Sequence, residues 1–173
     1  MNRRHVALGA MLTALALVIP LYFGFLRVVI PPFFTATLAS HVPSMLAMFI
    51  SPVVAGAVGA GSALGFFVVL GPVIGLRASI HIIFGVFGAI LYQRGMKPWL
   101  VLVLMLPVHA LGEALVVWPF VPTLRDAFLI TGVGTALHHI MDSFITLAVF
   151  GIVVKLLGER AFGAAGTTKG PAG

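Results

Sequence analysis

Residues 71–92 read GPVIGLRASIHIIFGVFGAILY, and this run is long and apolar enough to form one membrane-spanning helix. Within it Arg77 and His81 are four residues apart, so a helix places them on one face, about a turn from each other. A guanidinium at membrane depth costs about 2.5–3.5 kcal/mol on translocon-based scales. The run therefore predicts a polar partner for Arg77 inside the protein.

The composition of the whole chain indicates a membrane protein. Of 173 residues, 61% are hydrophobic and 8% are charged, and the mean hydropathy is +1.19, whereas soluble domains carry about 25% charged residues. The chain has no cysteine, which excludes disulfides and thiolate metal ligands. The net charge of +6 comes from Lys and Arg scattered between apolar runs, which favours membrane topology over nucleic-acid binding. We expect a lipid bilayer around the chain and no nucleic-acid partner.

The apolar runs predict an all-α membrane protein with six transmembrane helices and cytoplasmic N and C termini. The first run imitates a signal peptide but continues to Phe25, so we interpret it as an uncleaved helix. Residues 35–70 could form one helix or two helices hinged at Ser51. The positive-inside rule favours two, because six spans place most Lys and Arg in the cytoplasm. The expected spans are 6–25, 38–50, 53–70, 73–92, 98–118 and 127–155.

The remaining segments carry further expectations. Arg27 and a Pro-Pro pair interrupt the apolar pattern, which predicts a re-entrant loop over 26–37. The second span is short, and Ser40 is its expected N-cap, so its free backbone N–H groups would attract an anion within the membrane. Residues 1–157 would form the membrane domain and residues 158–173 a flexible cytoplasmic tail.

Polar side chains recur in four of the expected spans. His109 and Glu113 share a face of the fifth span, and His138 and Asp142 share a face of the sixth. His41 begins the second span, and the fourth contributes its arginine and histidine. The helical rise of 1.5 Å per residue places most of these groups in the outer half of the bilayer. We therefore expect a polar pocket that is open to the exterior.

The residue types in this pocket suit a small organic molecule. Arg77 would pair with a ligand carboxylate, histidines would bind a heteroatom, and Trp118 would stack on a ring. The alternative is a structural ion pair between Arg77 and Glu113, with each histidine satisfied by a backbone carbonyl. No cofactor and no metal site is expected. The candidate substrate-binding residues are Arg77, His81, His41, His109, Glu113, Trp118 and His138.

Several features together resemble a substrate-binding S component of an energy-coupling factor (ECF) vitamin transporter, most closely the niacin-specific members. They are the segment TATLASHVPSMLAMFISP at 35–52, the Gly- and Ala-rich third span, the segment from Arg77 to His81, and the pair Ala10 and Ala14. The resemblance covers about residues 3–155. It implies an S-component bundle in a prokaryotic plasma membrane that captures a vitamin from outside with high affinity and delivers it inward.

The same resemblance implies partners and a substrate. Ala10 and Ala14 would contact a membrane coupling subunit, which assembles with two cytoplasmic ATPases. The chain has no G-x-x-x-x-G-K-[ST] phosphate loop, so ATP would be used by the partners. Nicotinate suits the pocket through its carboxylate, its pyridine nitrogen and its flat ring.

Other functions remain open at this stage. The chain could be an S component for another small vitamin, or for cobalt or nickel, although it lacks the N-terminal Met-His of those members. His109, Glu113, His138 and Asp142 could instead relay protons in a small carrier, and facing histidines could hold a b-type haem. Because no nucleophile is paired with a base, we do not expect an enzyme.

Overall fold

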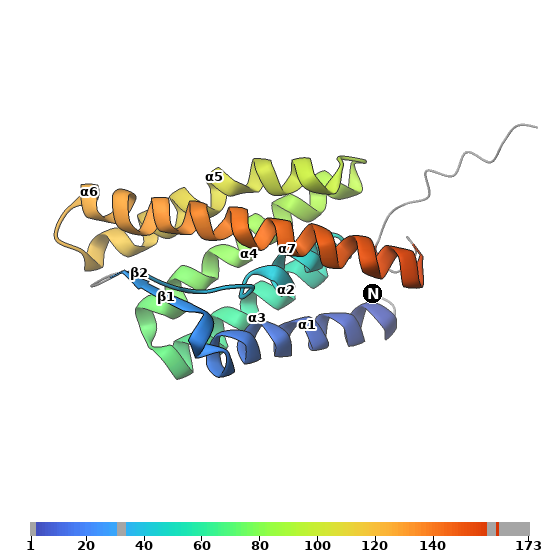
Figure 1. Cartoon of the computed structure of the whole chain (residues 1–173), viewed down its shortest axis with the longest axis horizontal. Helices are drawn as coiled ribbons and strands as arrows, with labels where there is room; N and C mark the ends of the chain where they lie inside the picture. Colours follow the sequence, from blue (N-terminus) through green and yellow to red (C-terminus); the bar gives the residue numbers. More distant parts are fainter. Residues whose placement is uncertain (1–2, 31–33, 159–161, 163–173) are drawn as a thin grey trace, which may run out of the picture.

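The computed structural model describes residues 3–30, 34–158 and 162, and within them five helical stretches are long and apolar enough to cross a membrane. They lie side by side in one bundle (Figure 1), which confirms the expected all-α membrane class. Most of the expected tail, residues 159–161 and 163–173, lies outside the described residues. The five stretches are α1 (Arg3–Tyr22), α3 (Pro52–Leu70), α4 (Pro72–Gln93), α5 (Pro98–Val117) with η2 (Trp118–Phe120), and α6 (Leu124–Asp126) continued by η3 (Ala127–Gly132) and α7 (Val133–Leu157).

Proline and glycine set the ends of the central helices. α3, α4 and α5 each begin with a proline, whose missing N–H is not needed in the first helical turn. Ser51 caps α3, since its hydroxyl accepts from the backbone N–H of Val54 at 3.2 Å. Gly71 has a φ of +93° and ends α3 in a conformation that favours glycine. The chain therefore turns back immediately, and α4 packs along α3.

The segment expected to be a re-entrant loop contains a β-hairpin. After η1 (Gly24–Leu26), strand β1 (Arg27–Ile30) pairs antiparallel with β2 (Phe34–Thr37), and Arg27 lies opposite Thr37. The hairpin lies at the end of the bundle that also carries α6, with β1 and β2 labelled at the left of Figure 1. The structure therefore corrects part of the loop prediction, since residues 27–30 and 34–37 form paired strands. This pairing satisfies the backbone groups that face the partner strand.

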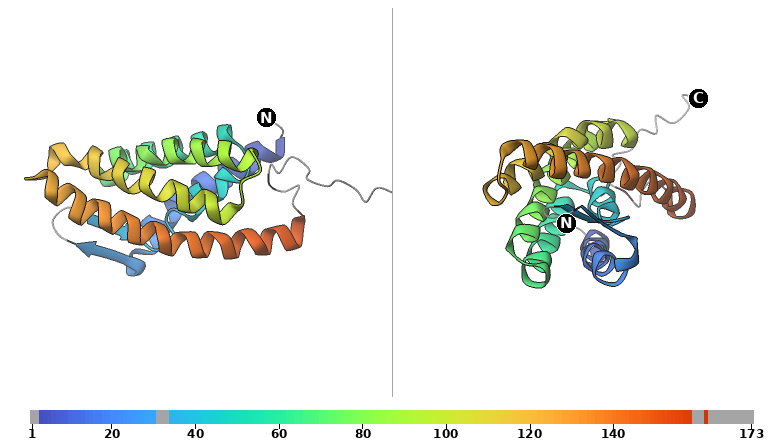
Figure 2. Two further views of the ribbon diagram at one scale, coloured as in Figure 1. Left: turned by 90° about the horizontal axis from the view of Figure 1, so that it is seen from above. Right: turned by 60° about the vertical axis from the view of Figure 1, so that its left-hand side comes forward.

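The second expected helix is shorter than predicted. In place of 38–50, α2 (Val42–Met48) is a seven-residue helix in which every residue is buried. The prediction of Ser40 as the N-cap is wrong, because His41 occupies that position. The side chain of His41 makes no capping hydrogen bond to α2. β2 and α2 lead the chain from the hairpin back into the bundle (Figures 1 and 2). The chain that leads into α2 is partly buried, and α2 itself is covered by the rest of the protein.

Small residues on α3 allow its neighbours to approach closely. A Cβ atom added at Gly59 would lie 2.7 Å from the backbone nitrogen of Ile82 on α4. On another face of α3, Cβ atoms at Gly61 and Gly65 would collide with Thr13 and Leu17 of α1. The Gly- and Ala-rich pattern of the third span therefore serves internal packing against two helices.

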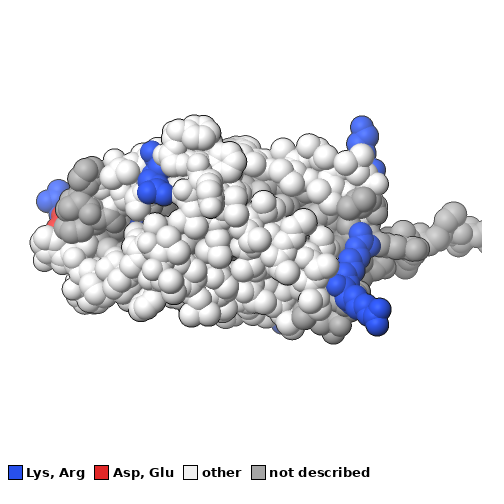
Figure 3. Space-filling view, turned by 90° about the horizontal axis from the view of Figure 1, so that it is seen from below, with Lys and Arg blue, Asp and Glu red and all other residues white. Residues whose placement is uncertain are grey.

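The two ends of the bundle differ in charge. The start of α1, the connection between α4 and α5 and the end of α7 lie at one end, opposite the hairpin and α6 (Figures 1 and 2). Figure 3 shows Lys and Arg near both ends of one face, with a broad uncharged belt between them. The elements at the end opposite the hairpin carry Arg3, Arg4, Arg94, Lys97 and Lys155, whereas the hairpin and α6 carry Arg27, Arg125 and Asp126.

Candidate substrate-binding site

A cavity of about 260 Å³ lies beneath the hairpin, in the half of the bundle away from the basic end. It is lined by residues of the end of α1, both strands, the end of α3, the first turns of α4, and parts of α5 and α7. Its volume is close to the lower limit of the roughly 300–1,000 Å³ typical of drug-sized ligands, so it suits a smaller molecule. Its charged and imidazole-bearing lining residues are Arg27, His41, Arg77, His81, Glu113 and His138.

Arg77 and Glu113 form a buried ion pair beside this cavity. Arg77 Nη2 and Nε donate to Glu113 Oε2 at 2.7 and 3.1 Å. The hydroxyl of Thr135 on α7 donates to the same oxygen at 2.6 Å. The polar partner expected for Arg77 is therefore a carboxylate of the chain itself, as in the structural alternative, although both side chains also line the cavity.

The guanidinium of Arg77 retains donors for a further partner. Its Nη1 donates to the carbonyl oxygen of Thr35 on β2 at 3.4 Å, and its carbon lies 5.3 Å from the centre of the Phe34 ring. An arginine has five N–H donors, and the contacts with Glu113 and Thr35 use three of them. Two N–H groups thus have no acceptor among residues 3–30 and 34–158.

Asp142 on α7 occupies the position that the sequence predicted for an anion. Its Oδ1 accepts from the backbone N–H of Ala39 at 2.7 Å, and its Oδ2 accepts from that of His41 at 2.9 Å. His138, one turn earlier on α7, lies 3.1 Å from Asp142 Oδ2 and donates from Nε2 to the carbonyl of Thr37 at 3.0 Å. The start of α2 therefore binds an internal carboxylate.

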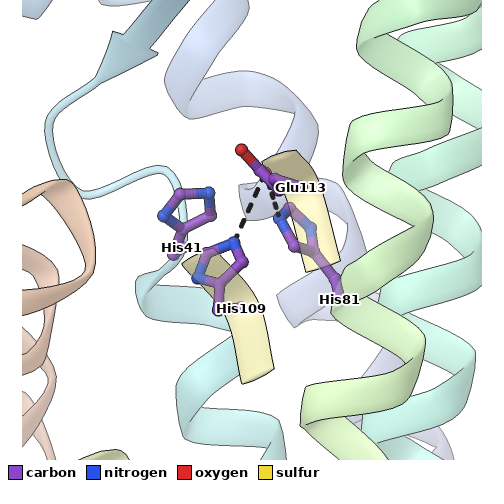
Figure 4. Close-up of side chains that lie close together, drawn as sticks. All are labelled: His41, His81, His109 and Glu113. Atoms are coloured by element: carbon purple, nitrogen blue, oxygen red, sulfur yellow. Dashed lines mark ion pairs between the residues drawn. The ribbon is translucent and has the colours of Figure 1, made fainter. Parts of the chain in front are cut away.

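A cluster of imidazoles fills the space between α2, α4 and α5. The ring of His41 lies 4.8 Å from that of His81 and 4.6 Å from that of His109, centre to centre. Figure 4 shows the rings of His81 and His109 directed toward Glu113, where their Nε2 atoms lie 3.9 and 3.4 Å from Oε1. All four residues are buried.

Each of the two central histidines is held by a hydrogen bond on its far side. Nδ1 of His81 lies 3.4 Å from the hydroxyl of Ser62 on α3. Nδ1 of His109 lies 3.0 Å from Nδ1 of His139, whose Nε2 lies 2.9 Å from the carbonyl oxygen of Leu102. The orientation of both rings toward Glu113 is therefore fixed by residues outside the cluster.

The structure brings together six of the seven residues suggested by the sequence. Trp118 is the exception, because it begins η2 with 49% of its surface exposed and does not line the cavity. His109 belongs to the cluster but is fully buried and does not line the cavity either. Ala10 and Ala14 are exposed on α1 and do not line the cavity.

Sequence reasoning missed three side chains that support the site. Thr135 and His139 contact Glu113 and His109 from α7, and Ser62 contacts His81 from α3. Thr135 and His139 are four residues apart, so the spacing that marks one helical face could have found them. Nothing in the pattern of the third span distinguishes Ser62 from a packing residue.

Comparison with known proteins gives one relative. The chain is 30% identical over 169 residues to the niacin transporter NiaX of Lactococcus lactis subsp. cremoris (strain MG1363). The aligned region covers 88% of this chain and 75% of that protein. No family model and no solved structure matches the chain. This relative is a transporter, and the chain has five helical stretches that could cross a membrane. Both findings confirm the expectation of a multi-pass protein of the cell membrane, and the first confirms that the chain is not an enzyme. The chain therefore belongs to the family of the niacin transporter NiaX, the niacin-type vitamin transport proteins that its sequence resembles.

Proposed function

We propose that the chain is the high-affinity substrate-capture subunit, or S component, of an ATP-driven ECF-type transporter that takes up niacin as nicotinate. The observation that carries this proposal is the position of Arg77, which lines a small cavity while two of its N–H groups have no acceptor in the described part of the chain. The similarity to a niacin transporter supports the choice of substrate.

Nicotinate would enter the cavity with its carboxylate toward Arg77. The remaining N–H groups of the guanidinium would donate to the carboxylate, in the way that arginine binds planar anions. The ring would lie among Phe66, Leu70 and Ile74, which give the cavity an apolar wall. The pyridine nitrogen would accept a hydrogen bond from His41 or His138, which also line the cavity.

The direction of uptake follows from a six-pass topology with both termini in the cytoplasm. β2 and α2 would together provide the second pass, because α2 alone is too short to span the membrane. The basic end of the bundle would face the cytoplasm, in agreement with the positive-inside rule. The cavity lies toward the other end and would then receive its substrate from outside.

Transport would require a membrane coupling subunit and two cytoplasmic ATPases. Ala10 and Ala14 are exposed on α1 and would allow a partner helix to approach closely. The sequence contains no phosphate loop for ATP, so the energy would come from those partners.

Calorimetry on the purified protein in detergent tests the substrate. Nicotinate is the ligand, and nicotinamide is the matched control because it keeps the ring and replaces the carboxylate with a neutral amide. We expect nicotinate to bind at least about tenfold more tightly, since a buried arginine prefers a charged partner. Equal affinities, or no binding of nicotinate, would reject the proposed role of Arg77, and screening of other small vitamins would follow.

A further inference from the structure

We propose that His41, His81, His109 and Glu113 bind a divalent transition-metal ion of the zinc class. One ring or carboxylate atom from each of the four residues lies within 4.8 Å of the others, and all four residues are buried. Three imidazole nitrogens with one carboxylate oxygen form a donor set that suits zinc, cobalt or nickel. The proposal goes beyond vitamin capture and does not depend on the identity of the substrate.

The hydrogen bonds of His81 determine which of its nitrogens carries the proton. The hydroxyl of Ser62 donates to the carbonyl of Gly59 at 2.9 Å, so its single proton is used. The contact between Ser62 Oγ and His81 Nδ1 must then be a donation from the ring. The neutral form of His81 therefore carries its lone pair on Nε2, which is directed toward Glu113.

His109 reaches the same state through a second histidine. Nε2 of His139 faces the carbonyl oxygen of Leu102 and must donate to it, because a carbonyl only accepts. In neutral His139 the other nitrogen, Nδ1, is then an acceptor, and Nδ1 of His109 donates to it. His109 therefore also carries a lone pair on Nε2 in its neutral form.

Two lone pairs and a carboxylate oxygen thus point at one buried space. Nε2 of His81 and Nε2 of His109 have no hydrogen-bond partner in the described part of the chain. Nδ1 of His41 has no hydrogen-bond partner there either, and it lies 3.4 Å from Oδ2 of Asp142. Acceptors that face each other without a positive charge between them are unfavourable in a low-dielectric interior. One cation in this space would satisfy the lone pairs together, whereas protonation would need two adjacent charged rings.

The surroundings of the four residues match those of metal ligands. Metal-bound histidines donate their second N–H to a fixed acceptor, and here Ser62 and His139 accept from His81 and His109. The second oxygen of Glu113 is held by Arg77 and Thr135, which leaves Oε1 free for an ion. Tetrahedral zinc places its ligand atoms about 3.4 Å apart, so small side-chain shifts would close the site.

The depth of the cluster indicates a resident ion rather than a transported one. His109 is fully buried and does not line the cavity, so one ligand lies behind the others. Four protein ligands complete a tetrahedral zinc site, which is the form that structural sites take. The ion would hold α2, α4 and α5 together at the wall of the cavity.

Metal analysis of the untagged protein tests the proposal, because an affinity tag of histidines would bind metal itself. The protein is purified in detergent without nicotinate, stripped with a chelator, dialysed and titrated with Zn²⁺ and with Co²⁺. We expect about one tightly bound ion per chain by elemental analysis, and the intense visible absorption of tetrahedral Co²⁺. A folded protein that retains no ion, or only octahedral Co²⁺, overturns the proposal.

Substitutions locate the ion. His109→Ala is expected to weaken metal binding by more than about tenfold, and Ser62→Ala by about tenfold through loss of the acceptor for His81. His5→Asn and Ser79→Ala are the matched controls, since both residues lie outside the cluster and are expected to leave metal binding unchanged. Binding that survives in His109→Ala and Ser62→Ala but is lost in His138→Ala would place the ion elsewhere and overturn the proposal.

Circular dichroism of each variant establishes that it is folded before its metal content is compared. Ser62→Ala removes only a hydroxyl, so it remains informative if His109→Ala does not fold. Nicotinate binding is measured separately on the same samples. A bound ion without nicotinate binding would reject the proposed substrate and support the metal site. Nicotinate binding without a bound ion would reject the metal site and support the proposed substrate.

Discussion

Asp142 of α7 accepts a hydrogen bond from the backbone N–H of His41, 101 residues earlier in the chain, at 2.9 Å. Its other oxygen accepts from the backbone N–H of Ala39 at 2.7 Å. The carboxylate is fully buried. One side chain of the last helix therefore fixes the start of α2 and the turn that leads into it.

Replacing Asp142 with asparagine is expected to destabilise the protein by about 2–3 kcal/mol, because an amide can accept only one of the two bonds and loses the charge that strengthens them. Unfolding in mixed detergent micelles measures this loss. Asp126→Asn is the control, since Asp126 lies near the surface of α6 and accepts from Thr123. An equal loss of stability in both variants would contradict a special role for Asp142.

The contributions of Arg77 and Glu113 to the stability of the protein are expected to depend on each other. In protein stripped of metal ions, Arg77→Met or Glu113→Gln alone leaves an uncompensated buried charge, which costs about 3–5 kcal/mol. The double variant removes both charges and is expected to recover most of the stability. Thermal unfolding of the four proteins measures the coupling, and additive losses would contradict it.

The same double variant separates folding from binding. It is expected to be folded and yet to lose nicotinate affinity by more than about tenfold, since the guanidinium is gone. Wild-type affinity in the double variant would show that the anchor for the substrate lies elsewhere in the cavity.

Gly59→Ala is expected to push α4 away from α3 at the level of His81, because the added Cβ atom meets the backbone of Ile82 at 2.7 Å. The cost of such overpacking is about 1–3 kcal/mol. Gly151→Ala on α7 is the matched control, since nothing lies within 4 Å of its added Cβ atom. There alanine is expected to stabilise the helix, by up to about 1 kcal/mol. Thermal unfolding compares the two, and equal midpoints would contradict the close approach.

Ala10→Trp and Ala14→Trp are expected to leave nicotinate binding unchanged and to abolish uptake by the assembled transporter, because a large side chain would block the approach of the coupling subunit. Leu111→Trp is the control, because Leu111 is half-exposed on α5. Helix α5 lies across the bundle from α1 (Figure 2). Uptake of labelled nicotinate into proteoliposomes measures the effect. Undiminished uptake in both alanine variants would reject this contact face.

The long helices could be predicted from the sequence, because twenty apolar residues flanked by proline, glycine and basic residues determine a span locally. α4 was expected at 73–92 and is found at Pro72–Gln93. The hairpin could not be predicted in the same way. Its strands have only four residues each, and a Pro-Pro pair lies between them.

The polar residues of the site were identified by their helical spacing, but their partners were not. Spacing places His109 and Glu113 on one face of α5 without showing which helix packs against that face. The pairing of Arg77 with Glu113, and of Asp142 with the turn before α2, joins segments 36 and about one hundred residues apart. Such pairings depend on tertiary packing, so the sequence left the ion pair as an open alternative.

The burial of α2 has a consequence for how the protein is made. Its seven residues extend about 10 Å, a third of the hydrocarbon thickness, so the translocation machinery has no complete span to recognise there. In the proposed six-pass topology, segment 34–50 would enter after its neighbours are already in the bilayer, and its hydrogen bonds to Asp142 would form only once the final helix is present. A nascent chain arrested before α7 would therefore be left with this stretch uninserted.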